Sequence, residues 1–190
     1  MTQGAPLRIG LLGGECTGKT TLAQQLANAI PAFIGEEYLR EFVTTFGRVP
    51  SLADQEGIFL TQQATMNTVL RAAAHVQTPA IVADPLPVMT AVYSLLYFDN
   101  HDLLVDGLAD AATYDLIVWC RPDVGWASDR GQRDGQAYAL AADGAIGTHV
   151  WPKLSEGNRL DLAGYPGNRL DRVLSALPTS YRRSTGHIAQ

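Results

Sequence analysis

The sequence predicts an α/β fold of three layers, in which helices cover both faces of a parallel five-stranded sheet. Two observations predict this architecture. Short, uniformly apolar segments alternate along the chain with segments of helical spacing, a pattern typical of a buried parallel sheet. A glycine-rich loop follows the first apolar segment and precedes the first helical one. The chain has 190 residues, of which 46% are hydrophobic. A single domain over residues 1–190 is therefore expected.

The glycine-rich loop carries the most specific signal in the chain. Residues 13–20 read Gly-Gly-Glu-Cys-Thr-Gly-Lys-Thr, which fits G-x-x-x-x-G-K-S/T without a mismatch. In such a P-loop, successive backbone N–H groups face the phosphates and the following helix adds a favourable field. The Lys19 ammonium is expected to reach the β- and γ-phosphates, and the Thr20 hydroxyl to hold Mg²⁺. The loop therefore predicts the P-loop NTPase fold with ATP and Mg²⁺ as cofactors, bound by Gly13, Gly14, Glu15, Cys16, Thr17, Gly18, Lys19, Thr20 and Thr21.

The other elements follow from apolar spacing and from the residues that end each segment. The first strand is expected at residues 7–12 and the first helix at residues 20–30, which Pro31 ends. Further strands are expected at residues 32–35, 79–84, 116–120 and 159–163, and further helices at 38–46, 52–76, 88–97, 103–112 and 168–177. Residues 121–157 have a mixed helix and loop character and are interpreted as a lid. The tail from residue 178 is expected to be flexible.

Composition excludes several classes of function. The net charge is −5 and the basic residues are scattered, so we expect no nucleic-acid partner. No window reaches the apolar length that spans a bilayer, and no leader segment precedes the first strand. The sequence therefore predicts a cytoplasmic protein without a membrane partner. Two cysteines, Cys16 and Cys120, make no disulfide framework. The oligomeric state is left open.

A P-loop is compatible with a GTP-dependent switch, an ATP-driven motor or a small-molecule kinase. A GTPase reads guanine with Asn-Lys-x-Asp, whereas both related segments here, at residues 158–161 and 168–171, read Asn-Arg-Leu-Asp. A motor of the AAA type needs a second acidic residue after the third strand, but Asp84 is followed by Pro85. A kinase needs an acceptor pocket, an acid near the acceptor hydroxyl, and cations over the γ-phosphate.

Two segments at strand ends supply the acceptor side of such a kinase. The polar run after the second strand contains Glu37, Tyr38 and Arg40, which are candidate substrate-binding residues because open α/β sheets bind ligands at this edge. The alternative is a solvated helix start. Asp84 closes an apolar strand, a costly position unless its carboxylate meets water, Mg²⁺ or a substrate hydroxyl. It is therefore a candidate for catalysis, for substrate binding and, with Thr20, for metal binding.

Cations for the transferring phosphate are expected in the P-loop and in the lid. Lys19, Arg130 and Arg133 are the candidate catalytic cations, and Arg121 lies in the same segment as the two lid arginines. The alternative for each arginine is an ordinary surface position.

These residues together resemble the NadR-type ribosylnicotinamide kinase domain and its relatives among small AAA-labelled ATP-binding proteins. The likeness covers most of residues 8–177 and rests on the P-loop, residues 37–43, Asp84 with Thr90, residues 114–116 and residues 126–130. The resemblance implies a parallel five-stranded core and transfer of the ATP γ-phosphate to the 5′-hydroxyl of a riboside. It implies that Asp84 is the acceptor-side acid, that the substrate is bordered by Glu37, Tyr38 and Arg40, and that the lid contains Asp129, Arg130 and Arg133.

The chain also departs from this family pattern. The family's strand-three motif resembles Asp-x-Asp, and Leu86 stands at the second acidic position. The segment of residues 132–157 also differs, and no adenylyltransferase domain precedes the P-loop, so a free-standing module is expected. The function expected is an ATP-dependent kinase acting on a nucleoside-like hydroxyl, with nicotinamide riboside as one candidate. The alternative is an ATPase or nucleotide-binding switch that acts on a protein partner.

Overall fold

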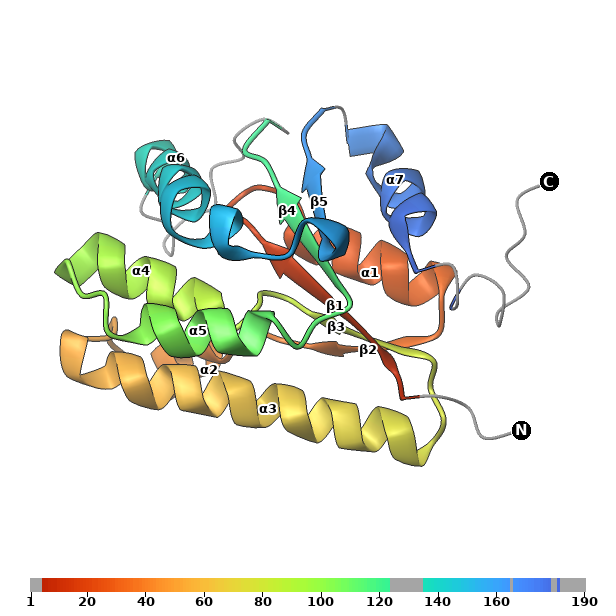
Figure 1. Cartoon of the computed structure of the whole chain (residues 1–190). Helices are drawn as coiled ribbons and strands as arrows, with labels where there is room; N and C mark the ends of the chain where they lie inside the picture. Colours follow the sequence, from red (N-terminus) through yellow and green to blue (C-terminus); the bar gives the residue numbers. More distant parts are fainter. Residues whose placement is uncertain (1–4, 124–134, 165, 179–180, 182–190) are drawn as a thin grey trace.

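One parallel sheet of five strands organises the chain (Figure 1). The structure, a computed structural model, describes residues 5–123, 135–164, 166–178 and 181. The strands are β1 (Leu7–Leu12), β2 (Ala32–Gly35), β3 (Ala80–Ala83), β4 (Leu116–Cys120) and β5 (Arg159–Leu162). Their order is β2-β3-β1-β4-β5, with every neighbouring pair parallel. All five carboxyl ends therefore meet at one edge, with the end of β1 between those of β3 and β4.

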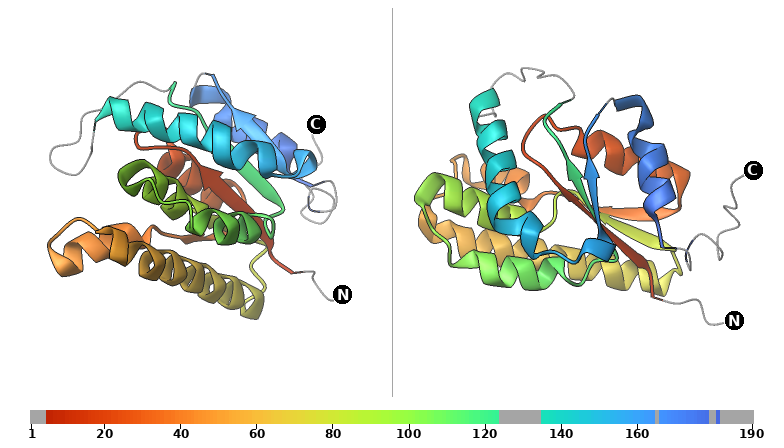
Figure 2. Two further views of the ribbon diagram at one scale, coloured as in Figure 1. Left: turned by 60° about the vertical axis from the view of Figure 1, so that its left-hand side comes forward. Right: turned by 45° about the horizontal axis from the view of Figure 1, so that its top comes forward.

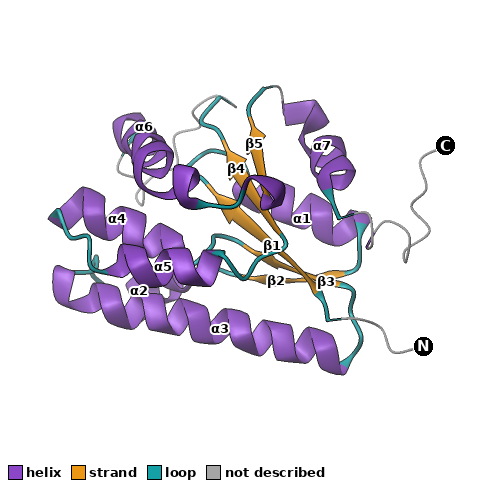
Figure 3. Ribbon diagram, viewed as in Figure 1, coloured by secondary structure: helices purple, strands orange, loops and turns teal. Residues whose placement is uncertain are grey.

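Helices cover both faces of the sheet (Figures 1 and 3). They are α1 (Lys19–Ala29), α2 (Tyr38–Phe46), α3 (Gln55–His75), α4 (Val88–Phe98), α5 (Leu103–Ala111), α6 (Gln136–Ala145) and α7 (Arg169–Ala176). Helices α1 and α7 lie on one face, while α3, α4, α5 and α6 lie on the other, as the turned views confirm (Figure 2). This is the three-layer α/β arrangement that the sequence predicts.

The core has two halves because successive strand residues point to opposite faces. Ile9 and Leu11 of β1 pack with α1 and α7, whereas Leu12 packs with the α3 to α6 side. All three side chains are fully buried. The apolar strands β3 and β4, whose residues are all buried, reflect this double coverage.

The structure defines part of residues 121–157, whose secondary structure the sequence did not resolve. Residues 136–145 form α6, a π-helical turn follows at Ile146–Val150, and a 3-10 turn at Trp151–Lys153. Ala139, Ala142 and Ile146 recur at helical spacing and are buried, and Ala142 and Ile146 belong to the core half that contains α4 and α5. This part of the predicted lid segment is therefore packed onto the domain. The rest, residues 124–134 with Arg130 and Arg133, lies outside the described residues.

The remaining differences from the prediction are at the ends of elements. The long helix expected at residues 52–76 begins as a 3-10 turn at Leu52–Asp54 and continues as α3. Ser51 and Asp54 make a reciprocal capping box at this start. In the tail, Tyr181 is partly buried against the α1 and α7 half of the core, while residues 179–180 and 182–190 lie outside the described residues.

Gly10 in β1 must be a glycine because the Leu86 side chain, shortly after β3, packs directly against its backbone. A Cβ at Gly10 would lie 2.5 Å from Cγ of Leu86, whose side chain is fully buried. Gly10→Ala is therefore expected to lower the free energy of unfolding by about 1–3 kcal/mol through overpacking. The matched control is Gly57→Ala in α3, where a Cβ meets nothing within 4 Å and a gain of up to about 1 kcal/mol is expected. Urea unfolding measures the free energy of unfolding of both variants. An equal change in the two would contradict the close packing of Leu86 on Gly10.

Candidate active site

The P-loop connects β1 to α1 at the carboxyl edge of the sheet. Gly13 and Gly18 have φ angles of 142° and 80°, in the region that favours glycine. A Cβ at Gly13 would lie 2.5 Å from the Cys120 carbonyl oxygen, and one at Gly14 would lie 2.9 Å from that of Ala139. Gly13 and Gly14 are buried, so the start of the loop packs closely against β4 and α6. The predicted nucleotide-binding residues Glu15–Thr21 line the cleft above it.

Two side chains of the motif brace the loop from within. The Thr17 hydroxyl donates to the Gly14 carbonyl oxygen at 2.9 Å, and Lys19 Nζ donates to the same oxygen at 2.5 Å. Lys19 Nζ also lies 3.5 Å from Thr17 Oγ1. The Lys19 ammonium is thus placed directly over the loop whose N–H groups the motif predicts to face phosphates.

A cleft of about 860 Å³ runs from the P-loop along the carboxyl edge of the sheet. Its walls come from the P-loop, from the β2–α2 turn, from α3, from the β3 exit and from α4. Among the lining residues are Glu36, Glu37, Leu39, Arg40 and Val43 from the β2–α2 side, Gln55, Ile58 and Gln62 from α3, and Met89, Thr90, Tyr93, Tyr97 and Phe98 from α4. A volume of this size suits a small molecule next to the P-loop.

Asp84 and Thr20 line the same cleft. Asp84 is only 8% exposed, and its backbone N–H donates to the Gly35 carbonyl oxygen at 2.9 Å. This bond holds the acid between the exits of β2 and β3. Mg²⁺ is usually held by one or two protein oxygens together with phosphate oxygens and water. A hydroxyl and a carboxylate facing one cleft beside a P-loop fit that donor set.

The structure separates the three candidate residues of the β2–α2 segment. Glu37 and Arg40 line the cleft and form an ion pair, with 3.2 Å between Glu37 Oε2 and Arg40 Nε. The described lining residues do not include Tyr38, which begins α2 with a half-buried side chain. Tyr38 contributes its backbone N–H instead, which donates to Gln62 Oε1 at 2.6 Å.

Leu86 stands two residues after Asp84, where the resemblance led us to expect a second acidic residue. Its side chain lies in the core half beside α3 and α4 and against Gly10, and its backbone N–H donates to the Leu11 carbonyl oxygen at 3.0 Å. It also borders the floor of the cleft. A leucine here leaves Asp84 as the single carboxylate that β3 and its exit present to the cleft within the described residues.

Arg121 is engaged outside the cleft. Its guanidinium lies 3.8 Å from the centre of the Trp119 ring, and its Nη2 lies 3.2 Å from Asp143 Oδ2 in α6. Burial raises the pKa of Asp143, and the nearby Arg121 charge partly offsets this rise. Arg121 therefore joins the exit of β4 to α6.

Sequence reasoning missed Arg169, a charged residue at the start of α7 that is only 4% exposed. Its Nη1 donates to the Thr17 carbonyl oxygen at 2.6 Å, and its Nη2 donates to that of Arg121 at 3.1 Å and pairs with Asp123. Arg169 thus ties the P-loop to the exit of β4. The signal was the second Asn-Arg-Leu-Asp copy; the arginine of the first copy, Arg159, likewise donates to a backbone carbonyl, that of Trp151, at 2.5 Å.

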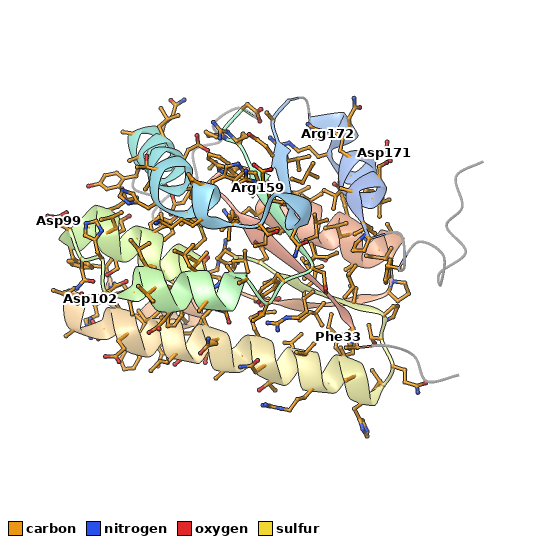
Figure 4. All side chains as sticks on the ribbon, in the orientation of Figure 1. Phe33, Asp99, Asp102, Arg159, Asp171 and Arg172 are labelled. Atoms are coloured by element: carbon orange, nitrogen blue, oxygen red, sulfur yellow. The ribbon has the colours of Figure 1, made fainter. Side chains whose placement is uncertain are left out.

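Replacing Arg169 by methionine is expected to lower the free energy of unfolding by about 3 kcal/mol, because Asp123, the buried Thr17 carbonyl and the Arg121 carbonyl lose their partner. The same change is expected to weaken the stabilisation that Mg-ATP gives, since the Thr17 carbonyl is no longer held. Thermal melting with and without Mg-ATP measures both effects. The control is Arg172→Met on the exposed side of α7 (Figure 4), where Arg172 Nη2 donates to the Asp161 carbonyl oxygen at 2.9 Å. If Mg-ATP raises the melting temperature of the two variants equally, Arg169 does not support the nucleotide site through Thr17.

The far wall of the cleft is aromatic, which sequence reasoning did not anticipate. Tyr93 and Tyr97 of α4 stack with 6.0 Å between ring centres, and Tyr97 stacks on Tyr138 of α6 at 5.4 Å. Tyr93, Tyr97 and Phe98 line the cleft. Their spacing along one helix was visible in the sequence, but only the fold shows that this face meets the cleft.

Cys120 has a structural position and not a reactive one. Cys120 is fully buried beneath the P-loop. Burial raises the pKa of its thiol to about 11, against the opposite influence of Lys19 and Arg169. The thiol is therefore protonated at neutral pH and not activated as a nucleophile.

A family model described as an AAA domain matches residues 8–151, which is most of the chain. This chain belongs to that AAA domain family. Within the described parts of this AAA domain protein, no helix is both long and apolar enough to cross a membrane. Among curated proteins, none matches it.

Solved structures show the same fold. A structure of NadR protein in complex with NR has a TM-score of 0.73 at 20% identity, covering 97% of this chain and 53% of that one. A second, of NadR protein with NAD and AMP-PNP, has a TM-score of 0.74 at 19% identity, covering 98% of this chain and 51% of that one. This AAA domain protein thus spans about half the length of those chains. Thymidylate kinase from Ehrlichia chaffeensis has a TM-score of 0.63 at 14% identity, covering 92% of this chain and 100% of that one.

Proposed function

We propose that this protein is an ATP-dependent kinase that transfers the γ-phosphate of ATP to a hydroxyl of a small nucleoside-like molecule. The observation that carries the proposal is that one cleft contains the P-loop with Lys19 and also the buried acid Asp84, with polar and aromatic lining residues beyond it. A phosphate donor and an alcohol acceptor therefore fit side by side. The similar NadR and thymidylate kinase structures support the kinase assignment by fold.

Each site residue has a definite part in this reaction. The P-loop N–H groups and Lys19 hold the triphosphate and stabilise the charge of the transferring group. Thr20 and Asp84 would hold Mg²⁺, which when bound neutralises charge on the phosphate oxygens. The acceptor oxygen forms a new bond to the γ-phosphorus while the bond between that phosphorus and the β–γ bridging oxygen breaks. The acceptor proton passes to the Asp84 carboxylate, and ADP leaves.

The charges of the cleft favour a nucleoside over a nucleotide as acceptor. Its described lining residues include the acids Glu36, Glu37 and Asp84 beyond the P-loop, and the one cation there, Arg40, is paired with Glu37. A nucleoside monophosphate would bring a phosphate that needs free cations. A neutral or cationic riboside needs none, and the aromatic faces of Tyr93 and Tyr97 suit a cationic ring. Nicotinamide riboside, whose pyridinium ring carries a positive charge, is therefore the first acceptor to test.

A product-detected screen tests this proposal. The protein is incubated with Mg-ATP and, separately, nicotinamide riboside, the common nucleosides and their monophosphates, and the products are identified by mass. A riboside monophosphate as product is the expected result. Release of phosphate from ATP that no acceptor changes would instead indicate a hydrolase that acts on a protein partner. Thermal stabilisation by ATP without turnover would indicate a nucleotide-binding module.

A further inference from the structure

The side-chain amide of a buried glutamine in α3 binds the backbone of the β2–α2 turn, on the acceptor side of the cleft. Gln62 is 3% exposed and lines the cleft. Its Nε2 donates to the Glu36 carbonyl oxygen at 3.0 Å, and its Oε1 accepts from the Tyr38 N–H at 2.6 Å. A carbonyl can only accept and an N–H can only donate, so these partners fix the orientation of the amide. The two bonds span the turn that carries Glu37.

The turn has no cap of its own. Glu37 is the N-cap residue of α2, and its side chain makes no capping hydrogen bond. The first backbone N–H groups of a helix have no partner within the helix. Gln62 supplies one for Tyr38 from a different helix, so the start of α2 is held from α3.

The close approach of α3 to β2 makes this contact possible. A Cβ at Gly35 would lie 2.0 Å from Met66 Sδ, so α3 packs directly onto the β2 backbone at this glycine. Met66 lies one helical turn after Gln62 and therefore on the same face of α3. Gly35 also accepts the backbone N–H of Asp84 at 2.9 Å. The turn held by Gln62 is thus continuous with the residue that holds the catalytic acid.

We propose that Gln62 is a positioning residue for the acceptor: its amide sets the Glu36–Tyr38 turn, and with it the Glu37 carboxylate, against Asp84. This inference rests on the proposed kinase function and adds a residue that does not touch the reacting atoms. Its role predicts an effect on the acceptor and not on ATP, because within the described residues the Gln62 amide hydrogen-bonds to Glu36 and Tyr38 and not to the P-loop.

The test compares two adjacent glutamines of α3. Gln62→Met keeps the length of the side chain and removes both hydrogen bonds. Gln63→Met is the matched control, since Gln63 Nε2 donates instead to Asp110 Oδ1 at 3.1 Å, toward α5 and away from the cleft. Both changes cost side-chain hydrogen bonds, so similar shifts in melting temperature are expected. With nicotinamide riboside as acceptor, Gln62→Met is expected to raise KM for the riboside about tenfold and leave KM for ATP within about twofold. Gln63→Met is expected to leave both unchanged.

A second readout does not need turnover. Amide hydrogen exchange at Tyr38 is expected to become about tenfold faster in Gln62→Met and to remain slow in Gln63→Met. Gln62→Glu retains the acceptor for Tyr38 but turns a carboxylate oxygen toward the Glu36 carbonyl, so it is expected to keep part of the protection and still raise KM for the riboside. Unchanged exchange in Gln62→Met, or equal changes in both KM values, would overturn the positioning role. A wild-type protein that phosphorylates no riboside would overturn the proposed function, and the Tyr38 exchange would still decide whether Gln62 holds the turn.

Discussion

Replacing Lys19 by alanine is expected to lower kcat by at least about 100-fold, the usual cost of removing one group that stabilises charge in the transition state. The ammonium lies 2.5 Å from the Gly14 carbonyl oxygen at the centre of the P-loop. The fold is expected to survive, because the Thr17 hydroxyl still donates to that oxygen and Lys19 is not part of either core cluster. Initial rates of ADP formation measure the loss of kcat, and the melting temperature shows whether the fold is retained.

Lys153 provides the control for this variant. It is the other lysine of the chain and is exposed in the 3-10 turn after α6. Lys153→Ala removes the same charge and is expected to leave kcat unchanged. Turnover that persists in Lys19→Ala at the wild-type rate would remove the P-loop from the catalytic account.

Replacing Asp84 by asparagine is expected to lower kcat by about 100-fold or more while KM for ATP changes by less than about threefold. The amide matches the carboxylate in shape but cannot take a proton from the acceptor, and it is a weaker ligand for Mg²⁺. The backbone bond from Asp84 to Gly35 remains, so the fold is expected to be retained. Steady-state kinetics with the acceptor identified by the product screen measure kcat and KM for ATP separately.

The exposed acid Asp171 on α7 (Figure 4) serves as the control. Asp171→Asn makes the same chemical change far from the cleft lining and is expected to leave both constants unchanged. If Asp84→Asn alters only the melting temperature, the carboxylate has a structural role and the acceptor proton goes elsewhere.

The elements that sequence predicted well are those with local signals. The strands at residues 7–12, 32–35 and 116–120 are apolar except for Arg8 and are bounded by turn residues, and β1, β2 and β4 have those limits. The P-loop needed only its own spacing and flanking elements. Asp84 was visible as one acid at the end of an apolar strand.

The residues that sequence did not reveal act across long separations. Arg169 reaches the P-loop from 152 residues away, and the repeated Asn-Arg-Leu-Asp pattern around it does not reveal which carbonyls it contacts. Gln62 lies beside Gln63 in a polar part of α3, and only the packing of α3 on Gly35 decides which amide meets the turn. Helix α6 was obscured because its buried side chains are mostly alanines, which give little contrast in an apolar pattern.

The stoichiometry of phosphate transfer tests the central claim most directly. The wild-type protein is given Mg-ATP with the best acceptor from the screen, and ADP, free phosphate and phosphorylated acceptor are measured in the same sample. A kinase with the geometry described above is expected to form about one phosphorylated acceptor per ADP, with little free phosphate, because the cleft directs transfer to an alcohol rather than to water. Equal formation of ADP and free phosphate, at a rate that the acceptor does not change, would contradict it.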